Sequence, residues 1–108
     1  RVVGEVAGKE CVLVDDMIDT AGTITEAIKV LTNAGAKKVI VAATHGILSD
    51  PAVRRLSESG ATEVVITDTL PVSAEKRFPS LTILSIAPLL ARAILEVFED
   101  GSVTSLFT

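Results

Sequence analysis

Residues 11–23, CVLVDDMIDTAGT, join an apolar run to three carboxylates and a turn of small and hydroxyl side chains. The run at residues 11–14 does not alternate polar and apolar side chains, which is typical of a strand covered on both faces in a parallel sheet. In open α/β sheets, ligands bind outside the carboxyl ends of the strands, which is where Asp15, Asp16 and Asp19 fall. We therefore expect a binding site directly after this strand.

The turn after this strand predicts a phosphate site at the start of a helix. Thr20 or Thr23 can cap that helix, and Gly22 lets the backbone approach a ligand closely. A phosphate monoester there would accept hydrogen bonds from free backbone N–H groups and from the threonine hydroxyls, and the helix dipole would favour its charge. Such a site needs no Lys or Arg.

Asp15 and Asp16 need partners of a different kind. Like-charge repulsion keeps them from the phosphate, so their natural partners are sugar hydroxyls or a hard cation such as Mg²⁺. A phosphorylated pentose would satisfy both ends of the site. The alternative is that these carboxylates are solvated turn residues and the threonines only helix caps. Three carboxylates within five positions repel one another unless a ligand or cation offsets their charge, which favours a site.

The rest of the chain repeats the order strand, loop, helix. Strands are expected at residues 2–6, 11–15, 38–43, 63–67, 81–85 and 103–107, and helices at residues 23–33, 50–59 and 88–98. Apolar residues that should face inward from the last helix are Leu89, Leu90, Ile94 and Phe98. Successive β and α units imply right-handed crossovers. We predict an α/β fold, a three-layer α/β/α arrangement with a mostly parallel sheet.

The residues of this site also carry a family resemblance. Residues 14–23 resemble the ribose 5-phosphate loop shared by phosphoribosyltransferases and phosphoribosyl diphosphate synthetases. Segments that resemble the C-terminal half of the synthetase family, in order and spacing, are residues 43–52, 67–71, 86–91 and 101–107. Together the segments are specific for ribose-phosphate diphosphokinase. The resemblance implies one phosphoribosyltransferase-like domain over residues 1–108, preceded in the family by a similar domain that this chain does not contain.

The resemblance implies a reaction for the complete enzyme, which would transfer diphosphate from MgATP to ribose 5-phosphate and release AMP. The residues implied to bind ribose 5-phosphate are Asp15, Asp16, Asp19, Thr20, Ala21, Gly22 and Thr23, with Asp15 and Asp16 also possible Mg²⁺ ligands. No catalytic residue is expected in this chain, because the family's ATP pocket, catalytic histidine and mobile basic loop belong to the preceding half. The chain alone is expected to bind ribose 5-phosphate weakly, without turnover.

A second site is implied near the end of the chain. Ser102 and Thr104 would help to form a regulatory phosphate or nucleotide site between the subunits of a full-length homo-oligomer. The alternative is an edge strand that only packs onto the sheet. The two are compatible, because alternate side chains of a strand face opposite ways.

Composition narrows the function classes. A net charge of −4 and an isoelectric point of about 4.9 argue against nucleic acid as a partner. No apolar run approaches the length of a membrane span, and the single cysteine, Cys11, fits a reducing cytoplasm. His45 is expected to be a structural hydrogen-bonding group, and Arg54 and Arg55 a solvated helix face.

Two rival functions remain open. A phosphoribosyltransferase would use the same loop but would need a hood over its base, and this chain has no Trp or Tyr. A non-catalytic regulatory homologue would be favoured by degraded site residues, whereas the loop at residues 15–23 is intact.

Overall fold

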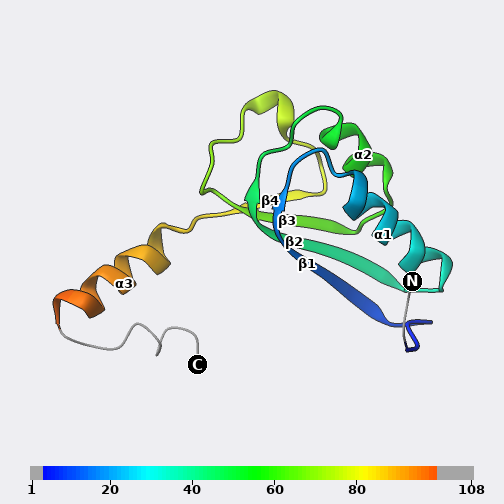
Figure 1. Cartoon of the computed structure of the whole chain (residues 1–108), viewed down its shortest axis with the longest axis horizontal. Coiled ribbons are helices and arrows are strands. Elements are labelled where there is room, and N and C mark those ends of the chain that lie inside the picture. Colours follow the sequence, from blue (N-terminus) through cyan, green and yellow to red (C-terminus); the bar gives the residue numbers. More distant parts are fainter. Residues whose placement is uncertain (1–3, 100–108) are drawn as a thin grey trace.

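The structure, a computed structural model, describes residues 4–99. In chain order the elements are β1 (Glu10–Ile18), α1 (Gly22–Asn33), β2 (Lys38–Gly46), α2 (Ala52–Glu58), β3 (Glu63–Thr67), the 3₁₀ helix η1 (Ala74–Lys76), β4 (Leu81–Leu84) and α3 (Ala87–Phe98). The strands form one parallel sheet in the order β1-β2-β3-β4 (Figure 1). Among the described helices, none has the length and apolar character to cross a membrane.

This architecture confirms the predicted α/β fold with a parallel sheet. The strand expected at residues 2–6 is wrong where it can be checked, because residues 4–6 form no strand. Residues 2 and 3 lie outside the described residues, and so does the whole strand expected at residues 103–107. β1 and β2 each extend three residues further than expected, because their pairing continues to Met17 opposite His45 and Ile18 opposite Gly46. Asp16, expected just past the end of the strand, therefore lies within β1 together with Asp15.

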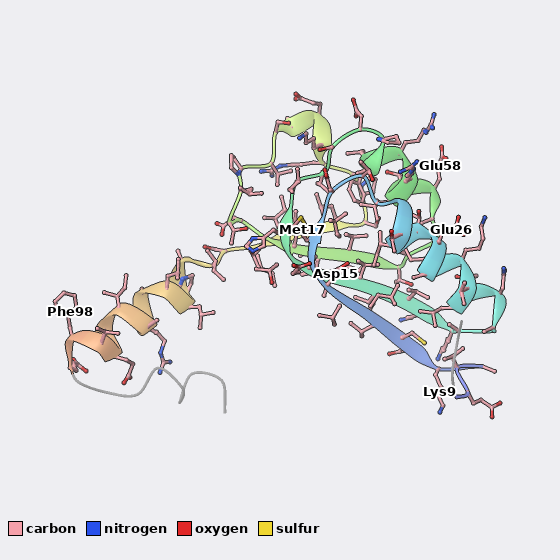
Figure 2. The ribbon with its side chains drawn as sticks, viewed as in Figure 1. Lys9, Asp15, Met17, Glu26, Glu58 and Phe98 are labelled. Carbon is pink, nitrogen blue, oxygen red and sulfur yellow. The ribbon has the colours of Figure 1, made fainter. Side chains whose placement is uncertain are left out.

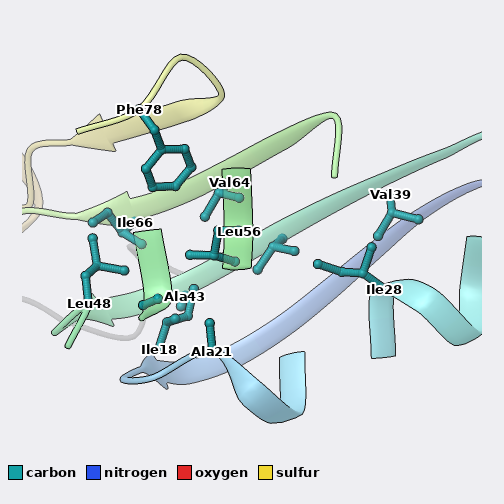
Figure 3. Close-up of a cluster of buried hydrophobic side chains, with 12 residues drawn as sticks. Ile18, Ala21, Ile28, Val39, Ala43, Leu48, Leu56, Val64, Ile66 and Phe78 are labelled. Carbon is teal, nitrogen blue, oxygen red and sulfur yellow. The ribbon is translucent and has the colours of Figure 1, made fainter. Parts of the chain in front are cut away.

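The core lies between the sheet and the helices α1 and α2, which cover the same face (Figures 1 and 3). Its buried side chains are Ile18, Ala21, Ile28, Val39, Val41, Ala43, Leu48, Ala52, Leu56, Val64, Ile66 and Phe78. Alternate residues of β2 and β3 supply much of this set, as the two-residue period of a strand requires. From α1, Ile28 is fully buried, and Ile24 and Leu31, at helical spacing from it, pack against the core.

The second helical layer differs from the expectation. α3 projects away from the sheet (Figure 1), and its predicted inward residues are exposed: Leu89 at 37%, Leu90 at 53%, Ile94 at 57% and Phe98 at 83%. The radius of gyration, 16.2 Å, exceeds the roughly 13 Å of a compact chain of this length. The apolar stripe of α3 was read correctly from the sequence, but in the described residues nothing covers it.

The opposite face of the sheet is likewise open. Val12 and Val14 of β1 are 59% and 79% exposed, although an apolar run without alternation predicted cover on both sides. Leu13 packs against the core while its two neighbours face away, so β1 is half-buried here. The run marks a strand with two apolar faces, of which α1 and α2 cover one.

Replacing Ile28 by Ala should test the core. The buried side chain leaves a cavity, so we expect Ile28→Ala to lower the free energy of unfolding by about 2–5 kcal/mol in urea denaturation. Val30→Ala, on the exposed side of α1, is the matched control and should cost about 0.5 kcal/mol. Equal losses for the two variants would contradict this placement of α1.

Candidate functional site

A pocket opens where β1 passes into α1. It has a volume of about 180 Å³, and its lining residues are Asp15, Met17, Ile18, Asp19, Thr20, Ala21, Gly22, Thr23 and Ile24. Figure 2 shows Asp15 and Met17 at this end of β1. The lining includes every residue of the predicted ribose 5-phosphate set except Asp16, which lies outside it. Thr20 and Thr23 are exposed, so the turn has room for a ligand.

The turn is made by Ala21, which adopts a left-handed conformation with φ 66° and occupies the N-cap position of α1. The cap predicted from Thr20 or Thr23 is wrong: no side chain caps this helix, because Thr23 already lies inside its first turn. A left-handed alanine costs about 1 kcal/mol, so its surroundings must hold it there. Because neither threonine caps the helix, the hydroxyls of Thr20 and Thr23 remain free to bind a ligand in the pocket.

The start of α1 presents backbone donors to the pocket. The first helical hydrogen bond runs from the N–H of Thr25 to the carbonyl of Ala21 at 3.1 Å, and the Thr25 hydroxyl donates to the same carbonyl at 2.6 Å. The N–H groups of Gly22, Thr23 and Ile24 precede that bond and have no partner within the helix. Such a set of amides at the positive end of a helix dipole is suited to an anion.

The carbonyl of Ile18, just before the turn, holds the end of β1 in place. It accepts the N–H of Ile47 at 2.9 Å and that of Leu48 at 3.2 Å, so the chain after β2 holds the end of β1. Gly46 lies against Ile66 so closely that a side chain there would clash. The position of the pocket is therefore set by packing between β1, β2 and β3.

The carboxylates Asp15 and Asp16 are exposed and linked to each other. The N–H of Asp16 donates to Asp15 Oδ1, and the N–H of Met17 donates to Asp16 Oδ1, both at 2.8 Å. Hydrogen bonding with Asp15, and next with the Met17 N–H, lowers the pKa of Asp16 below its ordinary value, with a smaller contribution from the nearby His45 ring. Asp16 is therefore ionised near neutral pH.

Asp15 and Asp16 have free carboxylate oxygens, which are the ligands that Mg²⁺ prefers. Each carboxylate has several lone pairs and uses only part of them for the backbone, so oxygens remain for a cation or sugar hydroxyls. Within residues 4–99, no group of three or more His, Cys, Asp or Glu side chains could hold a metal ion. Mg²⁺ commonly binds through one or two carboxylates and completes its shell with water and substrate oxygens.

The carboxyl end of β2 meets the end of β3 and the loop after it at one edge of the sheet, as expected for parallel strands. His45 Nδ1 lies 2.7 Å from Thr69 Oγ1, and the Thr67 hydroxyl donates to the carbonyl of Thr44 at 2.6 Å. Asp68 Oδ1 accepts the N–H of Ile86 at 2.8 Å. None of these residues lines the pocket beside Thr20. His45 thus has the hydrogen-bonding contact expected of a structural histidine.

Arg55 is the residue near the site that sequence reasoning missed. It is exposed, as expected, but its Nη1 donates to the carbonyl of Thr20 at 3.0 Å. A Cβ added to Gly22 would lie 3.3 Å from the same nitrogen. The contact joins residues 35 positions apart, and no local motif signals it. Ser102 and Thr104, predicted to form a regulatory site, lie outside the described residues.

Comparison with known proteins places these observations in a family. Residues 1–108 match the phosphoribosyl synthetase-associated domain. The chain is 65% identical over 107 residues to a ribose-phosphate pyrophosphokinase of Mycobacterium tuberculosis, covering 99% of this chain and 33% of that protein. A ribose-phosphate pyrophosphokinase of Bifidobacterium longum is 69% identical over 107 residues, which are 99% of this chain and 32% of the relative.

A solved structure agrees with these matches. The phosphoribosylpyrophosphate synthetase from Mycobacterium smegmatis superposes with a TM-score of 0.87 at 64% identity, covering 94% of this chain and 34% of that one. The chain therefore spans about a third of the length of the relatives that it matches. The resemblance to the synthetases that the sequence motifs predicted is confirmed.

The link between the two carboxylates can be tested by titration. In ¹³C NMR of the side-chain carboxyls, the midpoint of Asp16 should lie below 3.8, so Asp16 loses its charge only as the pH falls below that value. Asp15→Ala removes the largest cause and should raise the midpoint toward 3.8. Asp19→Asn is the control and should leave it in place. A midpoint at or above 3.8 in the unchanged chain would show that the two side chains are not coupled.

Proposed function

Since this chain belongs to the phosphoribosyl synthetase-associated domain family, we propose that it is the ribose 5-phosphate-binding part of a ribose-phosphate pyrophosphokinase. The observation that carries the proposal is the pocket between β1 and α1, with free amides and hydroxyls on one side and Asp15 on the other. A sugar phosphate has the complementary arrangement, an anion at one end and hydroxyl donors at the other.

The 5-phosphate would bind at the start of α1. The N–H groups of Gly22, Thr23 and Ile24 precede the first helical hydrogen bond, and the hydroxyls of Thr20 and Thr23 are exposed beside them. Hydrogen bonds from these neutral donors and the helix dipole would hold a dianion without an ion pair. Asp19, at the rim, would lie beside the phosphate and orient the turn.

The ribose ring would lie toward β1. Asp15 lines the pocket and Asp16 stays ionised next to it, so their oxygens could accept the ribose hydroxyls directly or share a Mg²⁺ ion with them. When bound, Mg²⁺ would offset the charge that builds up on the transferred diphosphate. The part played by these residues is to position the sugar, since aligning two reactants removes much of the barrier to their reaction.

The whole protein would then transfer diphosphate from MgATP to ribose 5-phosphate, giving phosphoribosyl diphosphate and AMP. The names of the relatives support this reaction, and ATP would bind outside this chain, which spans a third of their length. We also propose that the whole protein is a cytoplasmic homo-oligomer with a regulatory site that includes Ser102 and Thr104.

Binding by this chain is the direct test. In ¹⁵N NMR, ribose 5-phosphate should shift the amide signals of Gly22, Thr23 and Ile24. Thr23→Val removes one hydroxyl donor to a charged ligand and should weaken binding about tenfold. Thr32→Val, exposed at the far end of α1, should have no effect. Tighter binding of phosphoribosyl diphosphate than of ribose 5-phosphate would favour a phosphoribosyltransferase, and binding of neither would favour a regulatory homologue.

Catalysis requires the longer protein, so a chimera is the second test. This chain should replace the matching third of the M. tuberculosis relative and support AMP release from ATP and ribose 5-phosphate. Changing Asp15 and Asp16 together to Ala should lower kcat/KM about a hundredfold, because two charge-assisted contacts are lost. A folded chimera without AMP release, or one indifferent to both aspartates, would contradict the proposed role.

A further inference from the structure

The peptide unit between Thr20 and Ala21 is held from outside the pocket. Arg55 Nη1 donates to the Thr20 carbonyl at 3.0 Å, and the guanidinium also lies over Gly22, 3.3 Å from where a Cβ would be. Arg55 itself does not line the pocket. Its guanidinium thus contacts the turn at Thr20 and lies near Gly22, while Arg55 is not among the residues that line the pocket.

The helix that carries Arg55 is firmly placed. Ala52 and Leu56 of α2 are 0% and 1% exposed and belong to the core, and the Arg55 N–H donates to the carbonyl of Pro51 at 3.0 Å. The base of the arginine is therefore fixed relative to the sheet. The Arg55 guanidinium can therefore hold the Thr20 carbonyl in a fixed position relative to the sheet.

Fixing one end of a peptide unit also fixes the other end. A trans peptide is planar, so its carbonyl and its N–H point in opposite directions. With the Thr20 carbonyl directed at Arg55, the N–H of Ala21 points away from Arg55. Because Ala21 lines the pocket and Arg55 does not, this orientation keeps a carbonyl oxygen from facing a bound anion.

The peptide unit has a reason to turn over when it is not held. Ala21 has φ 66°, which is unfavourable for a residue with a Cβ, and turning this unit over would bring φ to negative values. The turned unit would direct the Thr20 carbonyl toward the ligand side, where it would repel an anion and remove a donor.

We infer that Arg55 is a positioning residue that locks the peptide between Thr20 and Ala21 with its N–H, and not its carbonyl, toward the anion pocket. The identity of the anion as a sugar phosphate rests on the proposed function, whereas the lock itself does not. Arg55 acts through the backbone and needs no contact with the ligand.

The test uses the ¹⁵N-labelled 108-residue chain and three variants. Arg55→Met keeps most of the aliphatic stem but removes the donor, Arg55→Lys keeps a charged donor, and Arg54→Met changes the neighbouring exposed arginine. Within residues 4–99, no side-chain hydrogen bond of Arg54 is found, which makes it the matched control. Amide shifts and hydrogen exchange are measured first without ligand, then with ribose 5-phosphate and with inorganic phosphate.

Without ligand, Arg55→Met should shift the amide signals of Ala21 and Gly22, while hydrogen exchange shows that the core amides of Ile28 and Val41 stay protected. It should also weaken the binding of both ligands about tenfold, as loss of a hydrogen bond to a charged group allows. Arg55→Lys should recover part of each effect, and Arg54→Met should show neither.

Two results would overturn the inference. Unchanged loop amides in Arg55→Met would show that the peptide is not held by Arg55. Weaker binding with an unchanged ligand-free loop would show that Arg55 meets the ligand directly. If Arg55→Met loses core protection, Arg55→Lys decides, because a lock predicts a partial change at Ala21 with an intact core. Binding of inorganic phosphate but not ribose 5-phosphate would refute the proposed function and leave the lock standing.

Discussion

The carbonyl of Ile18 is the point on which the site depends. One oxygen accepts the N–H groups of Ile47 and Leu48, so the ends of two neighbouring strands are tied together where the chain leaves the sheet. Ile18 and Leu48 are almost fully buried, at 2% and 1% exposure, which shields these bonds from water. With that point fixed, three residues suffice to turn the chain into α1, and the residues of its first turn line the same pocket as Asp15.

The sequence predicted the parts of the site that are close together along the chain. An apolar run, three carboxylates and a small-residue turn are local signals, and the prediction rested on them. In the structure, every residue of the predicted set except Asp16 lines one pocket. The role of Ala21 could not be predicted, because an alanine disfavours the left-handed conformation and only tertiary contacts keep it there. Arg55 was missed for the same reason: its contact with Thr20 depends on how α2 packs.

The fold shows a similar division. Hydrophobic period and turn residues predicted the order of strands and α-helices from β1 to α3, although residues 4–6, expected in a strand, form none. The motifs spread over the chain predicted the family that the comparisons confirm. The lengths of β1 and β2 were underestimated, because backbone pairing continues to Ile18 and Gly46, past the polar residues that interrupt the two apolar runs. For α3, amphipathicity shows that a helix has an apolar face but not which surface it meets.

The open faces have a practical consequence for work with this chain in isolation. Val14 on the sheet and Phe98 on α3 are 79% and 83% exposed, and β1 is an edge strand of the described sheet. Exposed apolar patches and free strand edges promote self-association that rises with concentration and with salting-out ions. A dimer or larger particle detected by light scattering would then reflect burial of these exposed surfaces. It would not indicate the quaternary structure of the longer relatives of this chain.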